Sequence, residues 1–130
     1  GPRKTPQLAA RYATEFNIGF RDLAGFAEVL ANVRAVCLEE GRDPATLSMS
    51  AAWPTVVGRN AAEIARRCAA VGIDAASDHG ERLVGTPAEV VDRLGALREL
   101  GVDRVYLQTV DMTDLEHLDL IAADVLPQLT

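Results

Sequence analysis

The sequence predicts an α/β fold in which parallel strands alternate with helices. Residues 47–57 and 104–109 are rich in small, β-branched and aromatic side chains and lack helical periodicity, which is typical of strands. The stretches between the extended runs have apolar residues every three or four positions, as amphipathic helices do. Strands separated by helices favour parallel pairing. We expect three main strands, at residues 16–18, 47–57 and 104–109, adjacent in that order.

The first part of the chain predicts a helix, a short strand and a long helix. Thr5 followed by proline is a suitable N-cap and first helical position, so a helix is expected over residues 6–13. The run EFNIGF predicts a brief strand at residues 16–18. Residues 22–40 carry an apolar stripe of helical period, and Gly41 is suited to end that helix.

The middle of the chain contains the longest predicted strand. Pro54 is expected to cause a bulge, a bend or a strand end, because proline cannot donate to a ladder. Asn60 and Glu63 then have the spacing of a capping box, which predicts a helix start. Residues 72–85 have no clear period and are expected to be irregular.

The last part of the chain has a clear helix start and stop. Thr86, a proline and Glu89 form a capping-box pattern, and Gly101 is expected to end the helix. A final helix is expected from Thr113, where the capping-box spacing recurs, with an apolar stripe that includes Leu115 and Leu118.

Composition limits the class of protein. A length of 130 residues fits a single domain over residues 1–130, and a hydrophobic share of 48% is ordinary for a soluble globular protein. The net charge of −6 argues against a nucleic-acid partner, which requires a cationic surface. No apolar run approaches the roughly 20 residues of a membrane span. Without a signal-peptide pattern, we expect no membrane partner and a cytoplasmic location.

Few side chains suggest chemistry of their own. Cys37 and Cys68 fall at apolar positions of helical patterns and are expected to be buried thiols, although a disulfide stays open. Their spacing does not fit a metal site, and the serines lack a nucleophile elbow. The acidic residues from Asp111 to Asp119 are explained by a helix N-terminus. We therefore expect no metal site and no catalytic residue.

The two histidines and one arginine pair were considered as ligands. His117 alternates with acidic residues and leucines, and we expect it on a solvated helix face, as we do Arg66 and Arg67. His79 lies in the irregular segment SDHGER. For His79 two interpretations stay open, a polar surface loop and a contact with a ligand.

The N-terminal segment GPRKT has the features of an anion-binding turn. A glycine-led loop that feeds a helix presents free backbone N–H groups and the positive end of the helix dipole to an incoming anion. Such a loop normally follows a strand that aims it, and no strand precedes it in this sequence.

Three segments resemble the luciferase-like monooxygenases, especially their deazaflavin-dependent oxidoreductases. GPRKTPQLAARYATEFN is similar to the loop and helix after their fifth strand, EEGRDPATLSMSAAWPTVVGR to a helix end and the seventh strand, and LVGTPAEVVDRLGALRELGVDRVYLQ to the final helix and eighth strand. GIDAASDHGE fits least well. The resemblance implies the C-terminal part of a (β/α)8 TIM barrel, its last three βα units, with parallel strands, helices outside and the N-terminal strands lacking.

The resemblance also implies a cofactor site. In that family the loop before the first of these helices holds the phosphate of coenzyme F(420) or FMN through backbone N–H groups. The matching positions in this sequence are Gly1, Arg3, Lys4 and Thr5. Asn17 has two interpretations, a contact with the cofactor at a strand end and a turn-forming residue.

The function implied is the C-terminal portion of a coenzyme F(420)- or flavin-dependent oxidoreductase, a reductase or monooxygenase, that is inert and binds no cofactor when alone. The alternative is a non-catalytic oligomeric binding or structural module derived from a half-barrel. One side of the middle strand carries Met49, Ala51 and Trp53. Because one sheet face must point away from the helices, into a packed barrel core, we expect it to need cover. The expected partner is the missing N-terminal barrel segment or a second copy of the chain.

Overall fold

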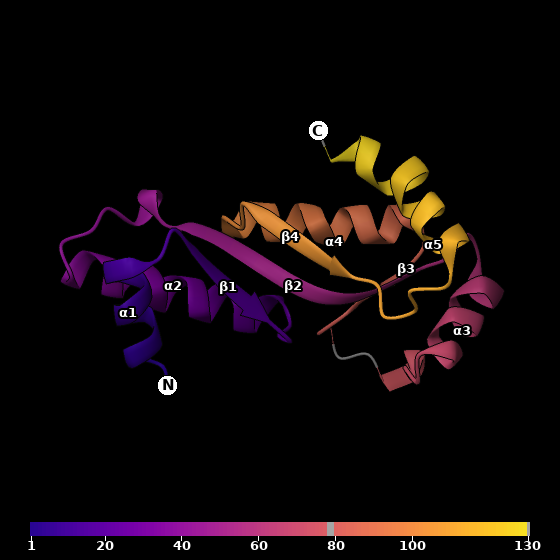
Figure 1. Ribbon diagram of the computed structural model, residues 1–130, viewed down its shortest axis with the longest axis horizontal. Coiled ribbons are helices and arrows are strands. Elements are labelled where there is room, and N and C mark those ends of the chain that lie inside the picture. The colour runs from indigo at the N-terminus through magenta and orange to yellow at the C-terminus, as the bar shows by residue number, and fades with distance from the viewer. Residues whose placement is uncertain (78–79, 130) are drawn as a thin grey trace.

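The computed structural model describes residues 1–77 and 80–129, which form one sheet with helices packed beside it (Figure 1). The strands are β1 (Glu15–Gly19), β2 (Ser48–Val57), β3 (Leu83–Gly85) and β4 (Arg104–Gln108). The α-helices are α1 (Lys4–Tyr12), α2 (Leu23–Glu39), α3 (Ala61–Ala70), α4 (Pro87–Leu100) and α5 (Leu115–Leu120). After α5 the chain stays helical through a π-turn (Ile121–Val125) and a 3-10 turn (Leu126–Gln128).

The strand β2 is the centre of the sheet, and all the pairings are parallel. β1 pairs with β2 from Glu15 opposite Ser48, and β4 pairs with β2 from Ser50 opposite Arg104. This confirms the three expected strands and their order. The short β3, which pairs with the last three residues of β2, lies in the stretch expected to be irregular. Three residues are too few to produce a periodic signal.

The strand end expected at Pro54 does not occur, because β2 continues to Val57. Backbone N–H groups point alternately to the two edges of a strand. The N–H of Ser48 donates to the carbonyl of Thr14 at 3.0 Å, so even-numbered residues of β2 face β1. Pairing with β1 ends at Ala52, and pairing with β3 begins at Thr55. An N–H at position 54 would therefore point to the gap between β1 and β3, where no strand among the described residues accepts it. Proline therefore costs no ladder bond here.

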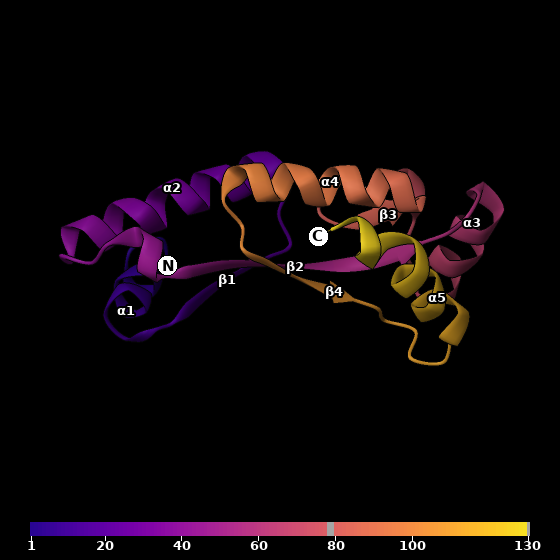
Figure 2. The same ribbon diagram turned by 90° about the horizontal axis from the view of Figure 1, so that it is seen from above.

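The helices α2 and α4 lie along one side of the sheet (Figure 2), and the apolar core lies between them and β2. Trp53 is fully buried there, with its ring edge-to-face against Phe26 at 5.2 Å and the Arg93 guanidinium 5.1 Å from its centroid. Its Nε1 donates to the carbonyl of Arg21 at 2.9 Å, so the polar end of the indole is satisfied. Met49 and Ala51 face the same core.

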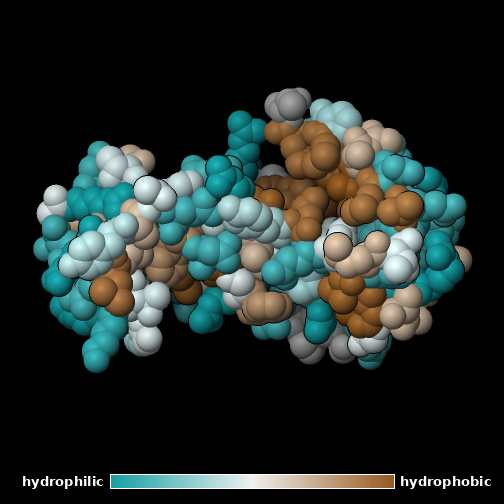
Figure 3. All heavy atoms as spheres, viewed as in Figure 1, coloured by the Kyte–Doolittle hydropathy of each residue, from teal (hydrophilic) through white to brown (hydrophobic). Residues whose placement is uncertain are grey.

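The opposite face of the sheet is polar, which corrects the expectation of an apolar face in need of cover. Glu15, Asn17, Ser50, Arg104 and Tyr106 are joined across it by hydrogen bonds. In Figure 3, which is viewed as Figure 1, hydrophilic residues spread across the middle of the molecule and hydrophobic ones gather near the C-terminal segment. The physical reason is the alternation along the strands, which sends the apolar side chains toward α2 and α4.

Several helix starts and stops occur as predicted. The Asn60 side chain accepts from the N–H of Glu63, Thr86 and Glu89 form a capping box, and Gly101 ends α4 with a φ of 93°. Cys37 and Cys68 are buried thiols, as expected.

Two predicted helix starts are wrong. α1 begins at Lys4 with Arg3 as its N-cap, rather than at Pro6 after Thr5. Proline fits within this first turn because the first N–H groups of a helix have no intrahelical partner. In the last helix the N-cap is Asp114, whose carboxylate accepts from the N–H of His117, and not Thr113. None of the helices in the described ranges is both long and apolar enough to cross a membrane.

Candidate functional site

An open groove of about 620 Å3 lies between the start of α1, the strand β1 and the helix α2. Gly1 and Thr5 line it from the N-terminal loop and first helical turn, Asn17 and Gly19 from the strand, and Asn32 from α2. The groove thus brings together Asn17 and two of the four residues, Gly1 and Thr5, to which the resemblance assigned the cofactor phosphate.

The N-terminal loop is tied to α2 rather than left free. The Asn32 Nδ2 donates to the carbonyl of Pro2 at 2.7 Å, and Arg3 forms an exposed ion pair with Glu39 at 3.3 Å. In the last turn of α1, Arg11 pairs with Glu40 at 2.6 Å, and that hydrogen bond lowers the pKa of the Glu40 carboxyl. The start of α1 is therefore oriented by polar contacts with a neighbouring helix.

The predicted phosphate residues differ in where they lie. The amino terminus of Gly1 donates to Thr5 Oγ1 at 3.4 Å beside the groove. The side chain of Arg3 is directed to Glu39, and Lys4 is exposed outside the groove lining. Because the helix begins at Lys4, the backbone N–H groups of Lys4 and Thr5 are the first in the helix and have no intrahelical partner.

Asn17 lies within β1, which removes the interpretation of a turn-forming residue. Its Nδ2 donates to Ser50 Oγ at 2.9 Å across the polar face of the sheet. The residue therefore belongs both to that face and to the groove lining.

Phe20, which the sequence did not single out, follows β1 at the carboxyl end of the strand. It has a φ of 54° and is 64% exposed. A left-handed backbone at a bulky residue costs about 1–2 kcal/mol, and such strain is concentrated at functional sites. No local sequence signal marks a non-glycine residue for this conformation.

A charged network occupies the other end of the polar face, at the first residues of β1 and β4. Arg104 Nη1 lies 2.7 Å from Glu15 Oε2, and the Tyr106 hydroxyl donates to Glu15 Oε1 at 2.9 Å. Hydrogen bonds from Ser50 and Tyr106, together with the Arg104 charge, lower the pKa of Glu15. In a closed barrel, residues at the amino ends of strands contribute stability rather than chemistry.

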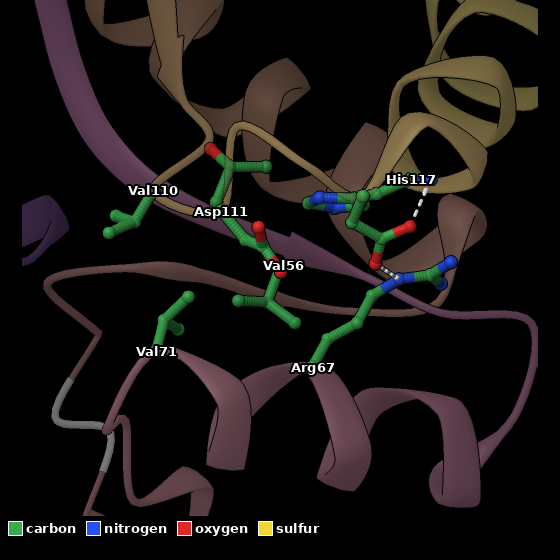
Figure 4. Close-up of a pocket in the computed structure, with 8 residues that line it drawn as sticks. Val56, Arg67, Val71, Val110, Asp111 and His117 are labelled. Atoms are coloured by element: carbon green, nitrogen blue, oxygen red, sulfur yellow. Dashed lines mark hydrogen bonds and ion pairs between the residues drawn. The ribbon is translucent and has the colours of Figure 1, made fainter.

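A buried polar cluster closes the carboxyl end of β2 (Figure 4). His117 Nε2 accepts the N–H of Val57 at 2.9 Å, and Arg67 Nη1 donates to the Val57 carbonyl at 2.9 Å. Arg67 Nε pairs with Asp114 at 2.8 Å. The cluster borders a small, partly open cavity of about 10 Å3, room for roughly one water molecule.

Both His117 and Arg67 are only 4% exposed, so the expectation of solvated faces was wrong for both. The last helical segment is rotated relative to the predicted stripe, and its buried positions are 117, 120, 121 and 125. Leu115 and Leu118 are exposed instead. The four-residue spacing from His117 through Ile121 to Val125 was the signal available in the sequence.

The ionisation of this cluster follows from its burial. Desolvation, with a contribution from the Arg67 charge, lowers the pKa of His117, which favours the neutral imidazole. The hydrogen bond from Arg67 lowers the pKa of Asp114. Burial opposes the charge on Arg67, but its pairs with Asp114 and Glu63 outweigh burial and raise the pKa of the guanidinium. With Nε2 occupied by Val57, His117 is a structural acceptor rather than a general base.

His79 lies outside the described residues. Within the described ranges, no three His, Cys, Asp or Glu residues are grouped so as to hold a metal ion.

Among the solved structures with the same fold are two coenzyme F(420)-dependent enzymes and one enzyme solved with a flavin. The coenzyme F(420)-dependent tetrahydromethanopterin reductase from Methanopyrus kandleri matches 100% of this chain with 49% of its own, at a TM-score of 0.76 and 15% identity. A coenzyme F(420)-dependent secondary alcohol dehydrogenase, solved with a coenzyme–acetone adduct, matches 100% of this chain with 47% of its own, at a TM-score of 0.74 and 16% identity.

A riboflavin lyase solved with modified FMN and riboflavin matches 95% of this chain with 40% of its own, at a TM-score of 0.77 and 20% identity. The chain shares their fold. The expected α/β fold with parallel strands and helices, similar to part of a TIM-barrel structure, is confirmed.

The chain spans less than half the length of each of these enzymes. No protein-family model matches the sequence, and no curated protein matches it either.

Proposed function

We propose that the chain is the C-terminal portion of a coenzyme F(420)- or flavin-dependent oxidoreductase and supplies part of the site for the cofactor phosphate. The observation that carries this proposal is the groove at the start of α1, on a chain with the fold of such enzymes. The first N–H groups of α1, at Lys4 and Thr5, face no helical partner, and the helix dipole adds positive potential there.

The residues of this chain would hold the cofactor rather than react with it. The Lys4 and Thr5 N–H groups, with the Thr5 hydroxyl nearby and Gly1 in the groove lining, suit a phosphate, and Asn17 suits a polar contact further along the groove. Bound in that place, the cofactor would supply the hydride or oxygen chemistry. The N-terminal loop supplies only part of a phosphate-binding site, and among the described residues it is held through contacts with α2. We therefore expect weak cofactor binding by this chain alone.

The partner we propose is the missing N-terminal barrel segment. Among the described residues β1 and β4 each pair only with β2, so each has a free edge suited to a further parallel strand. The three enzymes with the same fold are more than twice as long as the matched region. A second copy of the chain is the other occupant to be tested, and we place the protein in the cytoplasm, where thiols persist.

A second candidate function is a non-catalytic oligomeric module. The observation in its favour is that the polar face of the sheet satisfies itself, through Glu15, Arg104 and Tyr106 at one end and Asn17 with Ser50 further along. Because these side chains already have hydrogen-bond partners, the polar face of the sheet is stable in contact with water. It therefore needs no bound cofactor to satisfy its polar groups.

Changes in amide chemical shifts on addition of ligand distinguish a cofactor-binding portion of an oxidoreductase from a non-catalytic module, even when binding is weak. The 15N-labelled chain would be titrated with FMN, riboflavin and inorganic phosphate at millimolar concentrations. We expect FMN and phosphate to shift the amides of Lys4 and Thr5, and riboflavin, which has no phosphate, to leave them unchanged. Thr5→Ala, which removes the hydroxyl that lines the groove, should weaken the response severalfold, whereas the control Thr113→Ala, in the turn before α5, should not. Equal responses to FMN and riboflavin, or shifts confined to other regions, would exclude the phosphate site.

A further inference from the structure

The edge of β2 that faces β4 is closed beyond Pro54 by side chains instead of a strand, while β3 pairs with the opposite edge. The N–H of Asp103 donates to the Met49 carbonyl at 2.8 Å, so the odd-numbered residues of β2 face β4. Pairing with β4 ends at Pro54 opposite Gln108. The N–H and carbonyl of Val57 therefore point to an edge that β4 has already left.

Two side chains from different helices take the place of the absent strand. His117 from α5 accepts the Val57 N–H at 2.9 Å, and Arg67 from α3 donates to the Val57 carbonyl at 2.9 Å. Unpaired backbone groups in the interior cost about as much as a lost hydrogen bond, so these contacts matter for the docking of both helices.

The contact from His117 exists in one protonation state. An imidazole nitrogen accepts an N–H only when it carries no proton, so this hydrogen bond assigns the neutral ring with its proton on Nδ1. A protonated ring would direct Nε2–H against the Val57 N–H. Val57, the donor, is fully buried and is not among the residues that line the small cavity beside the cluster, so water does not replace the lost acceptor while the segment stays docked.

The charges that face His117 come from two elements. Arg67 on α3 is a buried cation, held by Asp114 at 2.8 Å and by Glu63 at 3.1 Å, and it disfavours a second positive charge. Asp114 and Asp111, from the turn before α5, favour protonation, but Asp114 is already paired with Arg67. Burial and Arg67 together outweigh the two carboxylates.

The segment that these contacts hold is the C-terminal one, residues 114–128. Leu120, Ile121 and Val125 are buried in the core cluster, and the segment packs on α4. Leu126 also lines an open groove of about 480 Å3 that runs along β4. When docked, the segment therefore covers α4 and the adjacent part of the apolar core, and one end of the groove along β4.

We propose that His117 is a pH-sensitive latch that fastens the C-terminal segment, residues 114–128, to the end of β2. The latch is closed when the imidazole is neutral. In the undocked segment His117 would titrate near its ordinary pKa of about 6.5, whereas in the docked segment the pKa is lower. Docking is therefore fully favoured above about pH 6.5 and weakens as the pH falls below it, by up to tenfold in the opening equilibrium per pH unit.

This inference is independent of the proposed cofactor site, because it concerns the other end of β2 and residues outside the groove. Its consequence is a local opening at mildly acidic pH, in which Leu120, Ile121 and Val125 leave the core while α2 and the strands stay folded. The side of α4 and the groove along β4 would then become accessible to another chain.

Hydrogen exchange tests the latch in the full chain. Amide protection would be measured from pH 7.5 to 5 and corrected for the intrinsic exchange rate at each pH. We expect protection of residues 115–125 to fall by up to tenfold per pH unit below about 6.5, while protection of α2 stays constant. Loss of protection in both regions together would mean global unfolding and would overturn the latch.

The matched variant is His117→Gln, whose side-chain oxygen can accept the Val57 N–H but does not titrate. Its protection in the same segment should be independent of pH over this range. An identical pH profile in wild type and variant would refute the role of His117. If the variant does not fold, the ring protons of His117 in the wild type provide the test by NMR. A midpoint at or above 6.5 contradicts the latch, and a lower midpoint that coincides with the change in exchange supports it.

Discussion

Arg104 and Glu15 form an ion pair of 2.7 Å between two strands that are not neighbours, since both β1 and β4 pair with β2. The pair spans the polar face of the sheet over Ser50, and the Tyr106 hydroxyl donates to the same carboxylate. The side chains therefore connect the two outer strands where the backbone does not. The ion pair thus helps to hold β1 and β4 at a set distance from each other. These are the two strands whose free edges would pair with the proposed N-terminal barrel segment.

Glu15→Gln should lower the melting temperature by at most a few degrees, because exposed ion pairs contribute little. The effect should shrink at 1 M NaCl, where charges are screened. Thermal unfolding followed by circular dichroism would measure it, with Glu39→Gln, in the exposed pair with Arg3, as the matched control. If the melting temperature of Glu15→Gln falls as far at high salt as at low salt, then Glu15 stabilises the protein through its hydrogen bond with Tyr106 rather than through its charge.

Trp53→Ala should reduce the free energy of unfolding by about 3–5 kcal/mol, because a fully buried aromatic ring leaves a large cavity. Trp53→Phe should cost less, since it mainly removes the hydrogen bond to the Arg21 carbonyl. Urea unfolding gives both values. Tyr12→Ala, at an exposed position, is the control and should change stability by no more than about 0.5 kcal/mol. A small effect at Trp53 would mean that the core is misplaced.

Substitution of alanine for two glycines, one inside α4 and one at its C-terminal end, should change the free energy of unfolding in opposite directions. Gly95 lies inside α4 with no atom near its missing side chain, so Gly95→Ala should stabilise the protein by about 0.5–1 kcal/mol. Gly101 has a φ of 93°, and an added Cβ would contact the Arg34 guanidinium, which itself donates to the Leu100 carbonyl. Gly101→Ala should therefore destabilise by more than about 1 kcal/mol. Urea unfolding of both variants checks the sign, and equal effects would contradict this helix end.

The local chemistry of helix ends was predictable from the sequence, whereas the orientation of the last helix was not. Asn60, Thr86 and Gly101 act through neighbours three or four residues away, so their roles follow from spacing alone. For His117 we predicted a solvated face because the residue stands among acidic ones, and the stripe through Leu115 and Leu118 competed with the four-residue spacing to Ile121 and Val125. The position of His117 is decided by the Val57 N–H, sixty residues away in sequence.

The site was predictable to a similar extent. The N-terminal turn and Asn17 were identified from residue type and family resemblance, and the groove brings Gly1, Thr5 and Asn17 together. The side chain of Arg3 could not be placed from sequence, because Glu39, its partner, is fixed only by the packing of α1 on α2. The polar side of β2 was visible in the alternation of residues 48–51, and only the packing of the helices shows which side they cover.

Asp114→Asn should destabilise the protein by about 2–4 kcal/mol, because it leaves the buried cation of Arg67 with one partner fewer. The pKa of Asp114 is lowered in the folded state, so its contribution is present above its ordinary pKa of 3.8 and is lost as the pH falls below it. The difference between the unfolding free energies of wild type and variant should therefore be constant from pH 8 to about 6.5, above the range in which the latch opens, and should narrow toward pH 2. Urea unfolding at several pH values measures this, with exposed Asp119→Asn as the control. A difference that does not narrow in acid would show that Asp114 acts by its hydrogen bonds alone.

Association of the chain should depend on the groove along β4. Leu126 and Leu129 are 49% and 38% exposed there, beside a strand edge that carries no partner among the described residues. Apolar side chains next to an open edge recruit further strands, so we expect light scattering to give a mass above 13.9 kDa that rises with concentration. Leu126→Asp should return the mass toward that of one chain. Leu38→Asp, an equally apolar position on α2 that is 68% exposed, should not, because no free strand edge adjoins it. A wild type that stays at 13.9 kDa at all concentrations would remove self-association and leave the N-terminal barrel segment as the sole proposed partner.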